Sequence, residues 1–151
     1  MSVMKIVTEG EPVLRRKARE ITQITKRLRV LVKNMLETMY EANGVGLAAP
    51  QVGVSERLVV IDVGNGPLVL INPEIVKQEG QVRDVEGCLS IPGRSEYITR
   101  AQKTQVKFTD LNGKTIVMEG EDLLARAFQH EIDHLDGVLF VDYLKTEEKE
   151  K

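Results

Sequence analysis

The clearest periodic pattern in the chain lies between residues 24 and 44. Its apolar residues recur at steps of three and four, the spacing of one buried helix face, at Leu28, Leu31, Val32, Met35, Leu36 and Met39. Thr25 carries a hydroxyl that can cap the first turn, and Gly44 follows the last apolar residue. The pattern predicts an N-terminal helix between these two residues.

The middle of the chain changes to short runs rich in branched residues. These runs are LVVIDV at 58–63, LVLINPEIV at 68–76, and VKFTD followed by LNGKTIVM at 106–118. Asn112-Gly113 is a typical hairpin turn, and Gly64-Asn65-Gly66-Pro67 marks a second turn. The runs therefore predict β-strands joined by tight turns.

Helical spacing returns from Glu121 to about Asp136. Its predicted buried side consists of Leu123, Leu124, Ala127 and Phe128. A helix, a series of strands and a final helix, in that order, favour an α+β fold over an alternating α/β fold.

Length and composition indicate one domain. A chain of 151 residues can bury a single core, which we expect over residues 1–144, with the charged KTEEKEK at 145–151 as a solvated tail. Hydrophobic residues make up 42% and charged residues 29%, and no run is apolar enough to cross a membrane. The first residues lack a secretory pattern, which predicts a cytoplasmic location.

Charge and cysteine content narrow the functional classes. The net charge is −2, with Lys and Arg interleaved with Asp and Glu, so no basic field favours direct nucleic-acid binding. Cys88 is the only cysteine, which excludes an internal disulfide. It is left as a buried thiol, a reactive thiol or a metal thiolate.

The strongest chemical motif is the segment from His130 to His134 on the last predicted helix. Residues four apart on a helix are offset by about 40°, so both imidazoles can face one metal ion. Glu131 lies about 60° from His134 around the axis, close enough to act on a bound water without being a ligand. Both histidines of the chain are in this segment. The plainer alternative is a pair of surface histidines on a polar helix face.

A catalytic metal site usually has three protein ligands and one open position. No histidine follows His134, and the later glutamates, Glu147, Glu148 and Glu150, lie in the charged tail. Cys88 is the best remaining third ligand, because a thiolate binds zinc or iron strongly and the segment 86–90 is predicted to form a tight backbone turn.

Three segments together resemble peptide deformylase. They are GVGLAAPQ at 44–51, EGCLS at 86–90 and QHEIDHLDG at 129–137, in the order and spacing of that family. The resemblance extends to VLFVDY at 138–143 and so covers nearly the whole chain. It implies antiparallel β-sheets packed around the C-terminal helix, and a hydrolase that removes the N-formyl group from the initiator methionine of nascent polypeptides and releases formate.

The resemblance also implies roles for particular residues. Cys88, His130 and His134 are expected to bind one ion per chain. Glu131 is expected to transfer the proton, with Gln51 and the Leu89 amide stabilising the oxyanion.

The expected binding site for the formylated methionine consists of Val45, Gly46, Glu86, Leu123 and Ala127, with the ring of His130. Gly46 has a bare backbone, which also allows an extended peptide to pair with it. Arg126 and Ser95 depart from residues that the family often has at these positions. For Leu123 and Ala127, ordinary core packing is the alternative role.

One thiolate and two imidazoles suit zinc by geometry and iron(II) by softness. The resemblance favours Fe(2+), with Zn(2+), Ni(2+) or Co(2+) as substitutes. It implies formyl-methionyl peptides or nascent chains as substrates and a transient ribosome association. Because the sequence here stops shortly after Leu144, we do not expect docking through the long C-terminal helix that some relatives have. No membrane partner is expected.

Two other functions remain open at this point. A zinc endopeptidase would share His130, Glu131 and His134 but take its third ligand elsewhere. A non-catalytic metal-binding domain would close the site with a fourth ligand, for which Asp84, Glu86 or Asp133 could serve.

Overall fold

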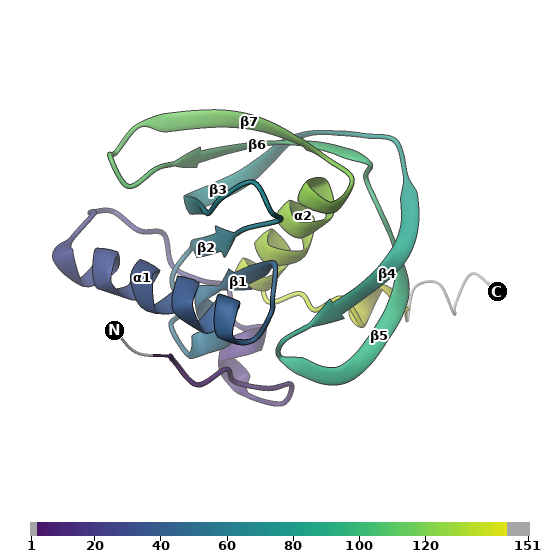
Figure 1. Cartoon of the computed structure of the whole chain (residues 1–151), viewed down its shortest axis with the longest axis horizontal. Helices are drawn as coiled ribbons and strands as arrows, with labels where there is room; N and C mark the ends of the chain where they lie inside the picture. The colour runs from purple at the N-terminus through teal and green to yellow at the C-terminus, as the bar shows by residue number, and fades with distance from the viewer. Residues whose placement is uncertain (1–2, 145–151) are drawn as a thin grey trace.

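A five-stranded sheet, a separate two-stranded sheet and two long helices form the fold of a computed structural model that describes residues 3–144 (Figure 1). In chain order the elements are η1 (Pro12–Arg15), α1 (Lys26–Glu41), β1 (Gly46–Ala48), η2 (Ala49–Val52), β2 (Leu58–Ile61), β3 (Leu68–Glu79), β4 (Val82–Cys88), β5 (Ile91–Arg100), β6 (Lys103–Thr109), β7 (Thr115–Glu121) and α2 (Leu123–Leu135). The predicted α+β class is confirmed.

The N-terminal helix α1 forms where its sequence pattern predicts it. The Thr25 hydroxyl accepts a hydrogen bond from the backbone N–H of Leu28 at 3.1 Å, which caps the first turn. At the other end, Asn43 rather than Gly44 adopts the left-handed backbone, with φ of 57°. The N–H of Gly44 then bonds to the carbonyl of Met39 at 2.9 Å, closing a Schellman-type end.

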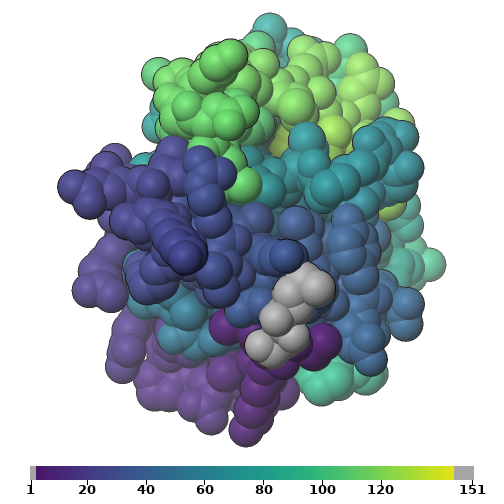
Figure 2. All heavy atoms as spheres, turned by 60° about the vertical axis from the view of Figure 1, so that its left-hand side comes forward, coloured from purple at the N-terminus to yellow at the C-terminus, as the bar shows by residue number. Residues whose placement is uncertain are grey.

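The surface position of α1 leaves one face for the core. In the space-filling view its blue atoms lie between the purple N-terminal segment and the green β6–β7 hairpin (Figure 2). The inner face of α1 packs with residues of β1, β2 and β3 in one apolar cluster, whose buried members include Leu28, Leu31, Val32, Met35, Met39, Leu47, Leu58, Val60 and Ile71.

The large sheet has the order β1-β2-β3-β6-β7, and every neighbouring pair is antiparallel. Strand β2 is buried on both faces: Leu58 and Val60 pack towards α1, whereas Val59 and Ile61 pack in the cluster that includes α2. This explains the continuous apolar run at this strand. The two predicted turns join β2 to β3 and β6 to β7, as expected.

The sheet formed by β4 and β5 was not predicted from the sequence pattern. Most residues of β4 are exposed, so the strand lacks an apolar face, and only Glu86 is fully buried. The tight turn expected over 86–90 is shorter than predicted. Glu86 to Cys88 close β4, and only Leu89 and Ser90 form the turn before β5.

Helix α2 lies between the five-stranded sheet and the curved β4–β5 sheet (Figure 1). It begins two residues later than predicted, and most of its residues are buried. Leu123 is 50% exposed, which corrects its assignment to the buried face, because the first residue of the helix lies at its open end. Ala127 and Phe128 are buried as expected.

The expected tail over 145–151 lies outside the described residues. Within residues 3–144, no helix combines the length and the apolar character needed to cross a membrane.

The end of α2 depends on Gly137. Its N–H bonds to the carbonyl of His134 at 3.2 Å, and the N–H of Val138 bonds to the carbonyl of Asp133 at 2.9 Å, which is a Schellman motif. Gly137 has φ of 77°, and a Cβ added there would lie 2.6 Å from the carbonyl oxygen of Arg15.

We expect Gly137→Ala to lower the free energy of unfolding by about 2–4 kcal/mol, because left-handed strain and a backbone clash add together. Gly53→Ala is the matched control: Gly53 also has a positive φ, of 84°, but open space around its Cβ position. The control should cost about 1–2 kcal/mol. Urea unfolding of the metal-free proteins measures both, and equal losses would contradict the role of the Arg15 contact.

Candidate functional site

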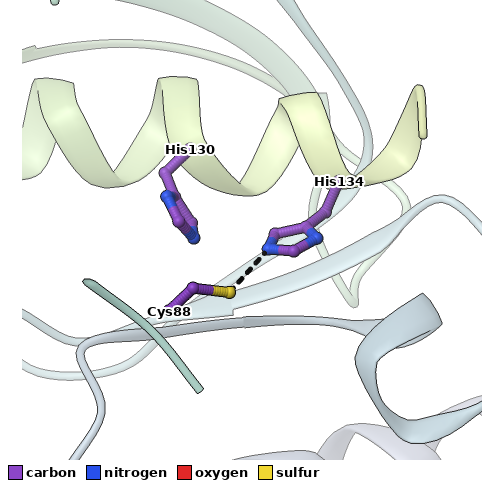
Figure 3. Close-up of side chains that lie close together, drawn as sticks. All are labelled: Cys88, His130 and His134. Carbon is purple, nitrogen blue, oxygen red and sulfur yellow. Dashed lines mark hydrogen bonds between the residues drawn. The ribbon is translucent and has the colours of Figure 1, made fainter. Parts of the chain in front are cut away.

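Three possible metal ligands meet where the end of β4 approaches α2. His130 and His134 project from the same side of α2, with ring centroids 4.9 Å apart. The sulfur of Cys88, the last residue of β4, lies 3.3 Å from Nε2 of His134 (Figure 3). One ligand atom from each of the three residues falls within 4.8 Å of the others. The structure thus brings the predicted trio together.

This donor set fits a metal ion. A tetrahedral ion with bonds of about 2.3 Å to sulfur and about 2.0 Å to nitrogen holds those atoms about 3.5 Å apart, close to the Cys88–His134 separation. Burial lowers the pKa of His134 well below 6.5, which keeps that imidazole neutral, as a metal ligand must be. Among residues 3–144, the trio is the one group of three or more His, Cys, Asp or Glu side chains that lie close enough together to hold a metal ion.

The residues considered as a fourth ligand are engaged elsewhere. Both oxygens of Glu86 bond to Arg100, and Oδ2 of Asp133 accepts hydrogen bonds from Arg100 and Tyr143. Asp84 is exposed, and its Oδ1 bonds to the N–H of Val85. These contacts favour an open site over a closed structural one.

Glu86 holds the His130 ring through its Nδ1 atom. Its Oε2 lies 3.1 Å from Nδ1 of His130, so the ring can donate there and keep its Nε2 lone pair for an ion. Burial alone would raise the pKa of Glu86, but hydrogen bonds from His130 and Arg100 lower it to about 2. The ionised carboxylate therefore acts as an acceptor.

Glu131 lies beside the trio and is 4% exposed. Its Oε2 is 3.9 Å from Nε2 of His130, and its Oε1 is buried without a hydrogen-bond partner among the described residues. Burial raises the pKa of Glu131 to about 7, although the nearby His130 charge opposes this shift. Such a carboxyl group is suited to exchanging a proton near neutral pH.

The protonation state of His130 differs between the metal-free and the metal-bound protein. Burial alone would lower the pKa of His130, but the neighbouring Glu131 and Glu86 carboxylates raise it well above 6.5. Metal binding at this imidazole therefore releases a proton.

Gln51 lies at the site, as expected, and is 1% exposed. Its Oε1 accepts a hydrogen bond from the N–H of Ala48 at 2.9 Å, which turns the amide nitrogen towards the site. That nitrogen donates to Oγ of Ser90 at 3.2 Å and approaches the Cys88 sulfur at 3.6 Å. The amide donor is thus fixed next to the trio.

A cavity of about 640 Å³ opens beside these residues. Its lining includes every residue predicted to bind substrate, namely Val45, Gly46, Glu86, Leu123 and Ala127. Arg126 and Ser95, the two departures from the family, also line it. Arg126 directs its guanidinium to the carbonyls of Ile98 and Val82 at 2.9 and 2.8 Å, so its charge is used against the β4–β5 sheet.

Sequence reasoning missed the groups behind the site. Arg100 and Tyr143 were not predicted, and Asp133 was considered only as a ligand. Arg100 bonds to residues 14 positions before it and 33 positions after it, and no local spacing signals such contacts.

The sequence matches a family model described as polypeptide deformylase over residues 3–150. It is 57% identical over 145 residues to the peptide deformylase of Desulfitobacterium hafniense, covering 96% of this chain and 97% of that relative. It is 55% identical over 148 residues to peptide deformylase 1 of Clostridium acetobutylicum, covering 98% and 99%. A crystal structure of peptide deformylase from Thermotoga maritima matches with a TM-score of 0.91 and 45% identity, covering 93% of this chain and 96% of that one. The chain therefore belongs to the polypeptide deformylase family and is a metal-dependent deformylase.

Proposed function

We propose that this deformylase removes the N-formyl group from the initiator methionine of nascent polypeptides and releases formate. The observation that carries the proposal is the buried Glu131 carboxyl group, which lies 3.9 Å from Nε2 of His130 and lines the cavity together with Cys88 and His130. The apolar side chains of Val45, Leu123 and Ala127 in the cavity lining suit a methionine side chain.

In this proposal Cys88, His130 and His134 hold the metal ion through one sulfur and two nitrogens. A bound ion lowers the pKa of a water ligand to about 7 and polarises a carbonyl group. Glu131 accepts the proton of the attacking water. It then returns that proton to the amine that leaves when the formamide bond breaks.

Gln51 and the backbone amide of Leu89 are proposed to stabilise the negative charge that develops on the formyl oxygen. The support for Gln51 is its fixed orientation, with the carbonyl bonded to Ala48 and the nitrogen 3.6 Å from the Cys88 sulfur. A donor held in place before the reaction needs no reorganisation in the transition state.

The substrate backbone is proposed to pair with β1. This strand pairs with β2 on one side only and forms one edge of the five-stranded sheet. Val45 and Gly46 also line the cavity, so an extended peptide added along this edge would bring its first side chain to the pocket.

We propose Fe(2+) as the native ion, one per chain, with Zn(2+), Ni(2+) or Co(2+) as functional substitutes. The mixed thiolate and imidazole donors accept all four metals. Cytoplasmic location and a transient ribosome association, in which the nascent chain is the substrate, stay predictions.

The first experiment tests reaction and substrate together. Protein purified anaerobically with Fe(2+) should release formate from a formyl-Met peptide, but no product from its acetyl-Met counterpart or from internal peptide bonds. Released formate and new amines are measured. A folded, metal-loaded sample that releases no formate would overturn the proposal, and internal cleavage would indicate an endopeptidase.

Glu131→Ala tests the acid/base role. We expect kcat to fall by about 10²–10⁴-fold, the usual contribution of a positioned acid/base group, while the metal content stays at one ion per chain. Metal content is measured by atomic emission on the folded variant. Loss of the ion with the fold intact would instead make Glu131 a ligand.

Gly46→Ala tests how Glu131 is held. A Cβ at Gly46 would lie 2.6 Å from Oε2 of Glu131 and 3.0 Å from its Cδ, so the carboxylate must move. Because a displacement of about 1 Å can cost about 10²-fold in rate, kcat should fall strongly while metal content is retained.

Gly44→Ala is the comparison variant for Gly46→Ala. Its Cβ would meet the end of the flexible Leu89 side chain, at 2.8 Å from Cδ1, which can move aside more easily. The loss in kcat should therefore be smaller. Equal losses in the two variants, or a change confined to KM for Gly46→Ala, would contradict a positioning effect on Glu131.

The ion assignment predicts sensitivity to air. The iron form should lose activity in air because iron(II) is itself oxidised and because oxidation of Cys88 removes a ligand, whereas the nickel or cobalt form should persist. Half-lives of formate release are measured for matched samples. Equal half-lives of the iron and nickel forms would count against the prediction.

A further inference from the structure

We propose that Tyr143 is a positioning residue for the metal site. Its hydroxyl and its ring fix Asp133 and Arg100, and this pair in turn fixes the Glu86 carboxylate that holds His130. The inference rests on the proposed role of His130 as a ligand. It assigns a function to residues 136–144 after α2, which contribute no ligand to the trio and do not line the cavity.

In this series of contacts, the first is made by the hydroxyl and the ring of Tyr143. The hydroxyl donates to Oδ2 of Asp133 at 2.6 Å. The ring faces the guanidinium of Arg100, whose Cζ lies 4.7 Å from the ring centroid, a cation–π distance. Tyr143 therefore contacts both partners of one ion pair.

The second contact is the Arg100 guanidinium. Its side chain is 4% exposed, and all three nitrogens are used. Nη1 donates to Asp133 at 2.7 Å, while Nε and Nη2 donate to the two oxygens of Glu86 at 3.1 and 2.7 Å. A two-point contact of this kind fixes both the position and the plane of the carboxylate.

The third contact joins Glu86 to His130. Oε2 of Glu86 accepts a hydrogen bond from Nη2 of Arg100 and also lies within hydrogen-bond distance of Nδ1 of His130. One oxygen therefore links the arginine to the imidazole. Nδ1 of His134, in contrast, is buried without a hydrogen-bond partner among the described residues. The network therefore acts on one of the two histidines, and its effect should appear in metal binding.

Tyr143→Phe is the sharpest variant, because it removes one hydroxyl and keeps the ring against Arg100. Asp133 keeps its bond to Arg100, and its side chain is 21% exposed, so water can replace the lost donor. We therefore expect a folded protein whose site is looser. Changes in outer partners of a metal ligand typically weaken metal affinity about 10–100-fold, and the lower end suits a residue this far from the ion.

The experiment titrates metal-free protein with Co(2+) against a competing chelator, without substrate. Tyr143→Phe should bind Co(2+) about tenfold more weakly and shift the visible absorption bands of the cobalt form. Tyr40→Phe is the matched control, because Tyr40 also donates to an aspartate, Asp62, at 2.6 Å but is an exposed residue of α1. The control should keep the wild-type affinity and spectrum.

A double-variant cycle tests the route. In a Glu86→Gln background, Tyr143→Phe should cause little further loss of Co(2+) affinity, because both changes act on the same contact. If Glu86→Gln does not yield folded protein, Asp133→Asn replaces it in the cycle and tests the contact between Tyr143 and Asp133. Wild-type affinity and spectrum for Tyr143→Phe, or losses that add fully, would overturn the inference.

The result is separable from the test of the proposed function. Wild-type protein that binds no metal, or releases no formate, would remove the proposed function itself. Wild-type protein that binds Co(2+) and releases formate, with Tyr143→Phe indistinguishable from it, would remove only the positioning role.

Discussion

The structure depends on the buried ion pair between Glu86 and Arg100, whose side chains are each 4% exposed. Removing one partner of such a pair leaves an uncompensated buried charge, at a cost of about 3–5 kcal/mol. The pair is therefore retained as a unit, with Asp133 and the Arg126 guanidinium around it. Glu86 and Arg100 both belong to the β4–β5 sheet. The contacts of the pair with Asp133, Arg126 and His130 join this sheet to α2 and also support a metal ligand.

Hydrogen bonds of polar side chains form much of the junction between α2 and the β4–β5 sheet. Arg126 bonds to carbonyls of both strands of the small sheet, and Gln129 bonds to the N–H and the carbonyl of Ala101 just beyond it. Hydrogen bonds of buried groups are directional, so they define one arrangement of the two parts more narrowly than apolar contact does. Cys88 comes from the sheet and the histidines from the helix, and the junction therefore sets the separation of the metal ligands.

Local patterns predicted elements whose stabilising contacts lie close together in the chain. Helix α1 has its cap and its apolar face in one segment, and the two predicted hairpins have their turn residues between adjacent strands. The β4–β5 sheet escaped prediction because its residues are mostly exposed and polar, so no apolar alternation marks it. Leu123 was assigned to the buried face because spacing alone does not show that the first turn of α2 is open at the cavity.

The sequence by itself determined the common direction of His130 and His134, because a helix places residues four apart on one side. Elimination and resemblance pointed to Cys88, and the structure places it beside them. Only the tertiary structure decided what surrounds this trio. It brings Glu131 close to the backbone of Gly46, and it links Tyr143 to Glu86 through a series of side-chain contacts. These contacts join separate elements, and their existence depends on how the sheets and α2 pack together, which short-range periodicity does not encode.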